Sequence, residues 1–132
     1  MIQRRTVGIV GTGHVGTAAA YALFNQGIAP RLLLLDANSD RAEGEAMDLM
    51  HGQMLVGRVT CEAVDYAGLS DAQVIVVSAG AGQASASETR LDLLKRNASI
   101  FRDIITELDR HAPEAFLIVA TNPVDVLAYI SQ

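Results

Sequence analysis

The feature that most constrains this chain is the glycine-rich turn Gly11-Thr12-Gly13-His14-Val15-Gly16. The apolar run Thr6–Val10 before it has strand character, and His14–Gln26 after it carries apolar residues along one helix face. In such a strand–turn–helix unit the first glycine permits a tight turn, the second lets the backbone approach a pyrophosphate, and the third lets the helix pack on the strand. The helix N-terminus supplies free N–H groups and partial positive charge. The predicted cofactor contacts in this turn are Gly11, Gly13, His14, Val15 and Gly16.

Short apolar runs alternate with helical patterns along the rest of the chain. Further strands are expected at Arg31–Asp36, Val59–Ala63, Val74–Val77 and Phe116–Ala120. Further helices are expected from a capping residue at Ser39 or Asp40 to about His51, over the apolar face from Leu91 to Leu108, and at Val124–Ile130. This alternation predicts an α/β fold with a doubly wound parallel sheet. Right-handed crossovers and the glycine turn predict the Rossmann strand order 3-2-1-4-5, with the weakly apolar third strand at an edge.

An acidic residue, Asp36, ends the second predicted strand, 20 residues after Gly16. A carboxylate there can accept hydrogen bonds from both hydroxyls of an adenosine ribose and would repel a 2′-phosphate. The chain is therefore expected to bind NAD rather than NADP. A methyltransferase also places an acid after its second strand, although its glycine pattern usually differs.

The charge and cysteine content narrow the class of protein. The net charge of −5, without a run of lysine or arginine, argues against a nucleic-acid or membrane-surface partner. The lone Cys61 forms no intrachain disulfide and belongs to no metal-binding pattern. No signal-like or membrane-spanning apolar segment is present, so a cytoplasmic location and no metal are expected.

Several motifs, in the right order, resemble the L-lactate and malate dehydrogenase family. They are Gly44–Leu49, Ser78–Gln83, Glu88–Leu94, Asn97, Ile100-Phe101 and Ala120–Leu127. The resemblance covers almost the whole chain and implies an NAD-dependent oxidoreductase that moves a hydride between NADH and a 2-oxo acid.

The resemblance also implies residue roles. Arg90 is similar to the loop arginine that polarises the substrate carbonyl, and Asn122 to the residue that hydrogen-bonds the substrate oxygen beside the nicotinamide. A guanidinium suits this role because it stays charged and stabilises developing negative charge. Ala79-Gly80-Ala81 would lie along the cofactor, Asn122 would also contact it, and the Asn122–Pro123 bond would be cis.

The substrate preference depends on Gln83, which resembles the family's specificity position. A neutral amide leaves room for the methyl group of pyruvate, whereas malate dehydrogenases usually carry arginine there, so L-lactate is favoured over malate. The segment Ala84–Glu88 is one residue longer than the family loop and lacks its Pro and Gly. Gln83 is thus either a substrate contact or a solvent-facing loop residue.

Family members are more than twice as long as these 132 residues. Residues 1–132 are therefore expected to be a truncated NAD-binding domain, without the sixth strand and inactive alone. The family's catalytic histidine, its aspartate partner and the arginine that grips the substrate carboxylate are expected beyond Gln132. None of the histidines resembles that catalytic residue: His14, His51 and His111. The resemblance implies a tetramer, and the alternative is a non-catalytic dinucleotide-binding module.

Overall fold

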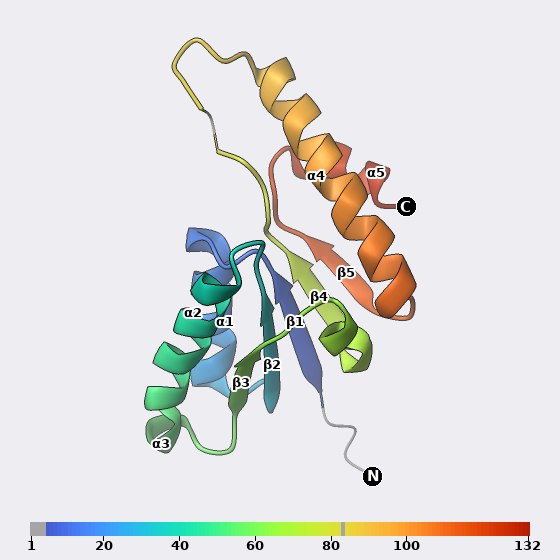
Figure 1. Ribbon diagram of the computed structural model, residues 1–132. Coiled ribbons are helices and arrows are strands. Elements are labelled where there is room, and N and C mark those ends of the chain that lie inside the picture. Colours follow the sequence, from blue (N-terminus) through green and yellow to red (C-terminus); the bar gives the residue numbers. More distant parts are fainter. Residues whose placement is uncertain (1–4, 83) are drawn as a thin grey trace.

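In the computed structural model, which describes residues 5–82 and 84–132, five strands form one parallel sheet in the order β3-β2-β1-β4-β5 (Figure 1). The strands are β1 (Thr6–Val10), β2 (Arg31–Leu35), β3 (Thr60–Ala63), β4 (Val74–Val77) and β5 (Phe116–Val119). The predicted order is confirmed, and each expected strand is present with ends shifted by at most one residue. Because parallel strands all point the same way, the segments after them meet at one edge of the sheet.

The helices also follow the prediction, with two additions. They are α1 (His14–Gln26), α2 (Ser39–His51), α3 (Gln53–Val56), α4 (Arg90–His111) and α5 (Val124–Ile130), with a 3-10 helix η1 (Ala67–Asp71). The short α3 and η1 were not predicted, because neither is long enough to show a helical period. The expected cap of α2 at Ser39 or Asp40 is wrong: the side chain of Asn38 accepts the hydrogen bond from the backbone N–H of Arg41.

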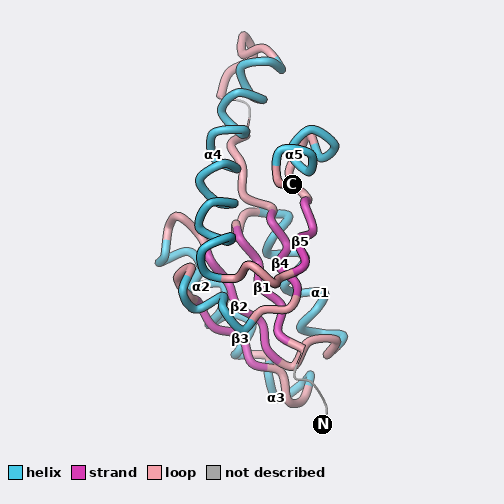
Figure 2. Tube along the Cα trace, turned by 90° about the vertical axis from the view of Figure 1, so that its right-hand side faces the viewer, coloured by secondary structure: helices cyan, strands magenta, loops and turns pink. Residues whose placement is uncertain are grey.

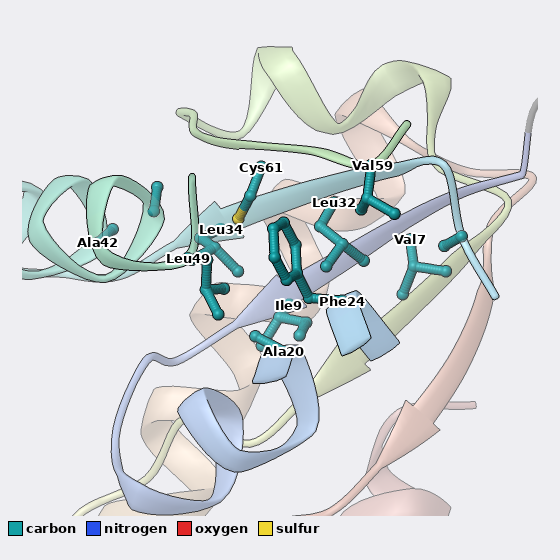
Figure 3. Packing of buried hydrophobic residues seen from close by; sticks show 12 residues of the cluster. Val7, Ile9, Ala20, Phe24, Leu32, Leu34, Ala42, Leu49, Val59 and Cys61 are labelled. Atoms are coloured by element: carbon teal, nitrogen blue, oxygen red, sulfur yellow. The ribbon is translucent and has the colours of Figure 1, made fainter. Parts of the chain in front are cut away.

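One face of the sheet is covered by α1 and α2. Phe24 of α1 packs with Leu32 and Leu34 of β2, and Leu49 of α2 lies in the same cluster (Figure 3). Cys61 of β3 completes this core, and its burial, with the charge of Glu62, raises its pKa to about 12. The thiol is therefore protonated and inert at neutral pH.

The other face is covered by α4. Phe101 and Leu108 are fully buried against Ile75 and Val77 of β4, together with Leu127 of α5. Because helices cover both faces, β1 and β2 are buried almost along their whole length, which explains their continuous apolar runs.

The first turns of α4 extend past the sheet. Both views show the start of this helix and the loop before it projecting beyond the carboxyl ends of the strands (Figures 1 and 2). Leu91, expected on the buried face, is accordingly 59% exposed, and burial begins at Asn97. The far edge is also open: Phe116 of β5 is 71% exposed. No helix in the described part of the chain is long and apolar enough to span a membrane.

Candidate functional site: a dinucleotide crevice

The glycine turn lies at the carboxyl edge of the sheet, between β1 and α1. Gly11 has a φ of +96°, and a Cβ there would lie 2.5 Å from the backbone nitrogen of Ala79. A Cβ on Gly16 would lie only 1.8 Å from the carbonyl oxygen of Gly11. A Cβ on Gly13 would instead meet nothing within 4 Å, so this position faces open space. Gly11 and Gly16 thus serve close packing, whereas Gly13 leaves the first turn of α1 open to a ligand.

Asp36 follows β2 and is tied to the turn. Its Oδ2 accepts hydrogen bonds from the backbone N–H of Thr12 at 2.7 Å and from the Thr12 hydroxyl at 2.9 Å. Its Oδ1 accepts from the backbone N–H of Asn38 at 2.9 Å. Partial burial acts to raise the pKa of Asp36, but these hydrogen bonds and the charge of Arg41 outweigh it and lower that pKa. The carboxylate is therefore ionised at neutral pH.

The segment after β4 forms the opposite wall. Ser78 donates its hydroxyl hydrogen to the carbonyl oxygen of Gly11 at 2.8 Å, which joins this wall to the glycine turn. The hydroxyl of Thr121, after β5, donates to the carbonyl oxygen of Ala79 at 2.7 Å. Gly80 lies so close to Thr121 that a Cβ would be 2.5 Å from its Cγ2. The start of the predicted cofactor segment 79–81 is thus held between the glycine turn after β1 and Thr121 after β5.

Asn97 of α4 is a residue whose positioning role the sequence pattern did not reveal. Its side chain is 2% exposed. Its Oδ1 accepts from the backbone N–H of Ala81 at 2.8 Å, and its Nδ2 donates to the carbonyl oxygen of Asn122 at 3.3 Å. One side chain therefore links two predicted site residues from different loops. A polar residue in the middle of an apolar helix face was the available signal.

These walls enclose a crevice of about 630 Å³. It is lined by Gly11, Gly13, Asp36, Ala79, Gly80 and Ala81, with Val64, Ile100 and Ile104 among the apolar lining residues. The structure thus brings together six of the predicted cofactor contacts. An open glycine at a helix N-terminus, an ionised carboxylate and an apolar end suit a pyrophosphate, a ribose and a planar base in that order.

His14 and Val15 stand apart from this crevice. They are the first two residues of α1, and both are exposed. His14 lines a second hollow, of about 650 Å³, between α1 and α2. Gly13 lines both hollows, whereas His14 lines only the second and Val15 lines neither.

The predicted substrate residues lie on the loops beyond the crevice. Arg90 is the exposed first residue of α4, preceded by a capping box in which Thr89 and Asp92 bond each other's backbone N–H. Asn122 is exposed in the loop after β5, and its bond to Pro123 is cis, as the resemblance implied. Gln83, the predicted specificity residue, lies outside the described residues. Among the described residues, no group of three or more His, Cys, Asp or Glu side chains is placed to hold a metal.

This fold and crevice define a Rossmann-type dinucleotide-binding domain, because the ligand edge lies where the strand order reverses between β1 and β4. Comparison with known families makes the assignment specific. Residues 5–132 match the family described as lactate/malate dehydrogenase, NAD binding domain, and the chain belongs to this family.

Individual relatives agree with this family. The chain is 73% identical over 132 residues to an L-lactate dehydrogenase of Salinibacter ruber, covering 100% of the chain and 42% of the relative. It is 44% identical to an L-lactate dehydrogenase of Priestia megaterium, covering 98% of the chain and 41% of that relative. The chain thus spans about two fifths of the length of these relatives.

Solved structures share the fold. A minor L-lactate dehydrogenase from Enterococcus mundtii, in a ligand-bound form, superposes with a TM-score of 0.93 at 43% identity, covering 98% of this chain and 41% of that one. Malate dehydrogenase from Archaeoglobus fulgidus, in complex with NADH, gives 0.89 at 37% identity, covering 96% and 43%.

Proposed function

We propose that this chain is the cofactor-binding domain of an NAD-dependent L-lactate dehydrogenase. The observation that carries the proposal is the crevice in which the ionised Asp36 lies beside the open Gly13. The identity of 73% to an L-lactate dehydrogenase favours pyruvate and L-lactate as the substrate pair.

The polar groups of the crevice suggest a definite arrangement of the cofactor. The pyrophosphate lies at Gly13 and the N-terminus of α1, where free N–H groups and the helix dipole stabilise its charge. A carboxylate has about four acceptor positions, and Thr12 and Asn38 occupy three of those on Asp36. One ribose hydroxyl can therefore donate to the fourth acceptor position of Asp36. The second ribose hydroxyl can donate to Oδ2 once the Thr12 hydroxyl rotates away from it. A 2′-phosphate would meet the negative charge of Asp36.

The substrate end of the site requires Arg90, at the start of α4, and Asn122, in the loop after β5. The bound nicotinamide supplies or receives the hydride. Arg90 stabilises the negative charge that develops on the substrate oxygen, and the Asn122 side chain hydrogen-bonds the same oxygen. The Asn97 side chain bonds both the Ala81 N–H and the backbone carbonyl of Asn122, and so holds the Asn122 backbone beside the cofactor segment.

Proton transfer requires a group that we assign to a second domain outside residues 1–132. His14, His51 and His111 lie on α1, α2 and α4, and none lines the crevice. We therefore propose that the general acid and its aspartate partner, together with the arginine that binds the substrate carboxylate, come from that domain. We further propose that the intact enzyme is a homotetramer. Its small-molecule partner is a 2-oxo acid substrate.

The cofactor assignment is tested by titrating the intact protein with NADH and with NADPH and following dinucleotide fluorescence. NADH is expected to bind at least about tenfold more tightly, which corresponds to about 1.4 kcal/mol. Asp36→Ser should reduce this preference because it removes the charge that opposes the 2′-phosphate. Equal affinities in the unsubstituted protein contradict the assignment.

A malate dehydrogenase is the second candidate, because the Archaeoglobus fulgidus malate dehydrogenase also shares the fold. Steady-state kinetics of the intact protein with pyruvate and oxaloacetate separates the two. We expect a higher kcat/KM for pyruvate, and Gln83→Arg should shift the preference toward oxaloacetate by adding a charge partner for a second carboxylate. An unaltered preference means that Gln83 does not select the substrate.

NADH binding without turnover of any 2-oxo acid would indicate a non-catalytic module.

A further inference from the structure

The apolar end of the crevice, beyond Asp36, carries acidic groups at its rim. Ile100 and Ile104 of α4 and Val64 after β3 line this end. Asp65 and Asp103 line the same crevice. This apolar end of the crevice is expected to take the base of the dinucleotide, because the turn and Asp36 are suited to the pyrophosphate and ribose. This step rests on the proposed NAD binding.

The two carboxylates differ in their bonding. Asp65 Oδ1 accepts a hydrogen bond from the backbone N–H of Gly68 at 2.9 Å, which holds the start of η1. Within the described chain, the side chain of Asp103 makes no hydrogen bond or ion pair. Asp103 is exposed and lies one residue before the buried Ile104, so its charge remains hydrated while its acceptors are available to a ligand.

Tyr66 supports this position of Asp103. The pKa of the Tyr66 phenol is raised by burial and by the charges of Glu107 and Asp103. The carboxylate of Asp103 thus acts on a side chain from the β3–β4 connection that lines the same crevice. Tyr66 and Asp103 therefore bring polar groups from two different elements to the same crevice.

We infer that Asp103 accepts a hydrogen bond from the exocyclic 6-amino group of the adenine and makes the site selective for adenine over 6-oxopurines. An ionised carboxylate only accepts hydrogen bonds, and the 6-amino group is the sole N–H donor of the adenine base. Hypoxanthine places an oxygen at position 6, whose lone pairs face the carboxylate unless the base shifts in its slot.

The test compares binding of NADH and of reduced nicotinamide hypoxanthine dinucleotide to the intact protein, by fluorescence titration. The unsubstituted protein should bind NADH about tenfold more tightly, equivalent to about 1.4 kcal/mol. Asp103→Leu should bring this ratio to within about twofold, because the acceptor is lost. Asp103→Asn should do the same, because its amide can donate to the oxygen at position 6.

Asp109→Asn is the matched control, since it removes the same charge from another exposed position of α4, away from the crevice. It should retain the full ratio. A ratio near one in the unsubstituted protein, or one unchanged by Asp103→Leu, overturns the inference while NADH binding stands. Failure to bind either dinucleotide overturns the proposed function as well.

Discussion

The glycine turn of the crevice and the loop before α4 are held in different ways. At the glycine turn, hydrogen bonds join groups far apart in the sequence, Thr12 to Asp36 and Ser78 to Gly11, and these bonds are partly buried. In the loop before α4, the bonds are exposed and several join close neighbours, such as Ala84 to Glu88 and Thr89 to Asp92. The Arg96 side chain of α4 also donates to the carbonyl oxygen of Gly82 and pairs with Glu88.

This difference separates two kinds of site. The glycine-turn end has its shape without a ligand, since ordering it is part of folding the sheet. Arg90 stands in solvent at the tip of α4, so its working position depends on what binds against it. Cofactor binding should therefore be sensitive to substitutions that also destabilise the fold, and substrate turnover to substitutions that do not.

The largest effect is expected at Gly16. Gly16→Ala places a Cβ 1.8 Å from the carbonyl oxygen of Gly11 and 2.7 Å from the Ser78 hydroxyl, so the turn must open. We expect a loss of at least about 3 kcal/mol in the free energy of unfolding, measured by denaturant titration. Gly44→Ala, in α2 with nothing within 4 Å, is the control and should stabilise by about 0.5 kcal/mol. Equal effects at the two glycines would refute the close packing.

The next effect is expected at Asn97, which joins the segment after β4 to the loop after β5. Asn97→Ala leaves the Ala81 N–H and the Asn122 carbonyl without this partner, and should lower the free energy of unfolding by about 2 kcal/mol. Hydrogen exchange at the Ala81 amide should become faster. Asn25→Ala, which removes an exposed amide bonded only within α1, should change little. Unchanged exchange at Ala81 would argue against the link.

A smaller effect, dependent on pH, is expected at Asp36. Its lowered pKa means that its ionised form stabilises the fold at neutral pH and that this contribution is lost as pH falls through the folded-state pKa, below the ordinary value of about 3.9. Asp36→Asn should therefore destabilise by about 1.5 kcal/mol at pH 7. The difference from the unsubstituted protein should shrink toward pH 2 in denaturant titrations. A difference constant with pH would contradict the hydrogen-bonding account.

The smallest effect on stability is expected at Arg90. Arg90→Ala removes an exposed side chain and should change the free energy of unfolding by no more than about 0.5 kcal/mol. NADH affinity should also stay within about twofold, whereas kcat/KM for pyruvate should fall by about a hundredfold or more if Arg90 polarises the carbonyl. A parallel loss of stability and turnover would remove the contrast between the glycine turn and the start of α4.

Much of this molecule was predictable because its signals are local or periodic. The runs Thr6–Val10 and Leu32–Leu35 identify buried strands, and the spacing from Gly16 to Asp36 anticipates the crevice. The cap at Asn38 was missed because Asn38, Ser39 and Asp40 are all good capping residues, and only the chain's path after β2 selects among them.

The strand order, the glycine turn and the acid beside it can be read from the residues alone, because they depend on short-range backbone rules and on right-handed crossovers. How the loops meet depends instead on the packing of the folded chain. The Asn97 side chain joins Ala81 to Asn122 across 16 and 25 residues, and three donors occupy Asp36 before any ribose arrives. Such contacts follow from packing α4 and the strand ends together, and no spacing within one segment records them.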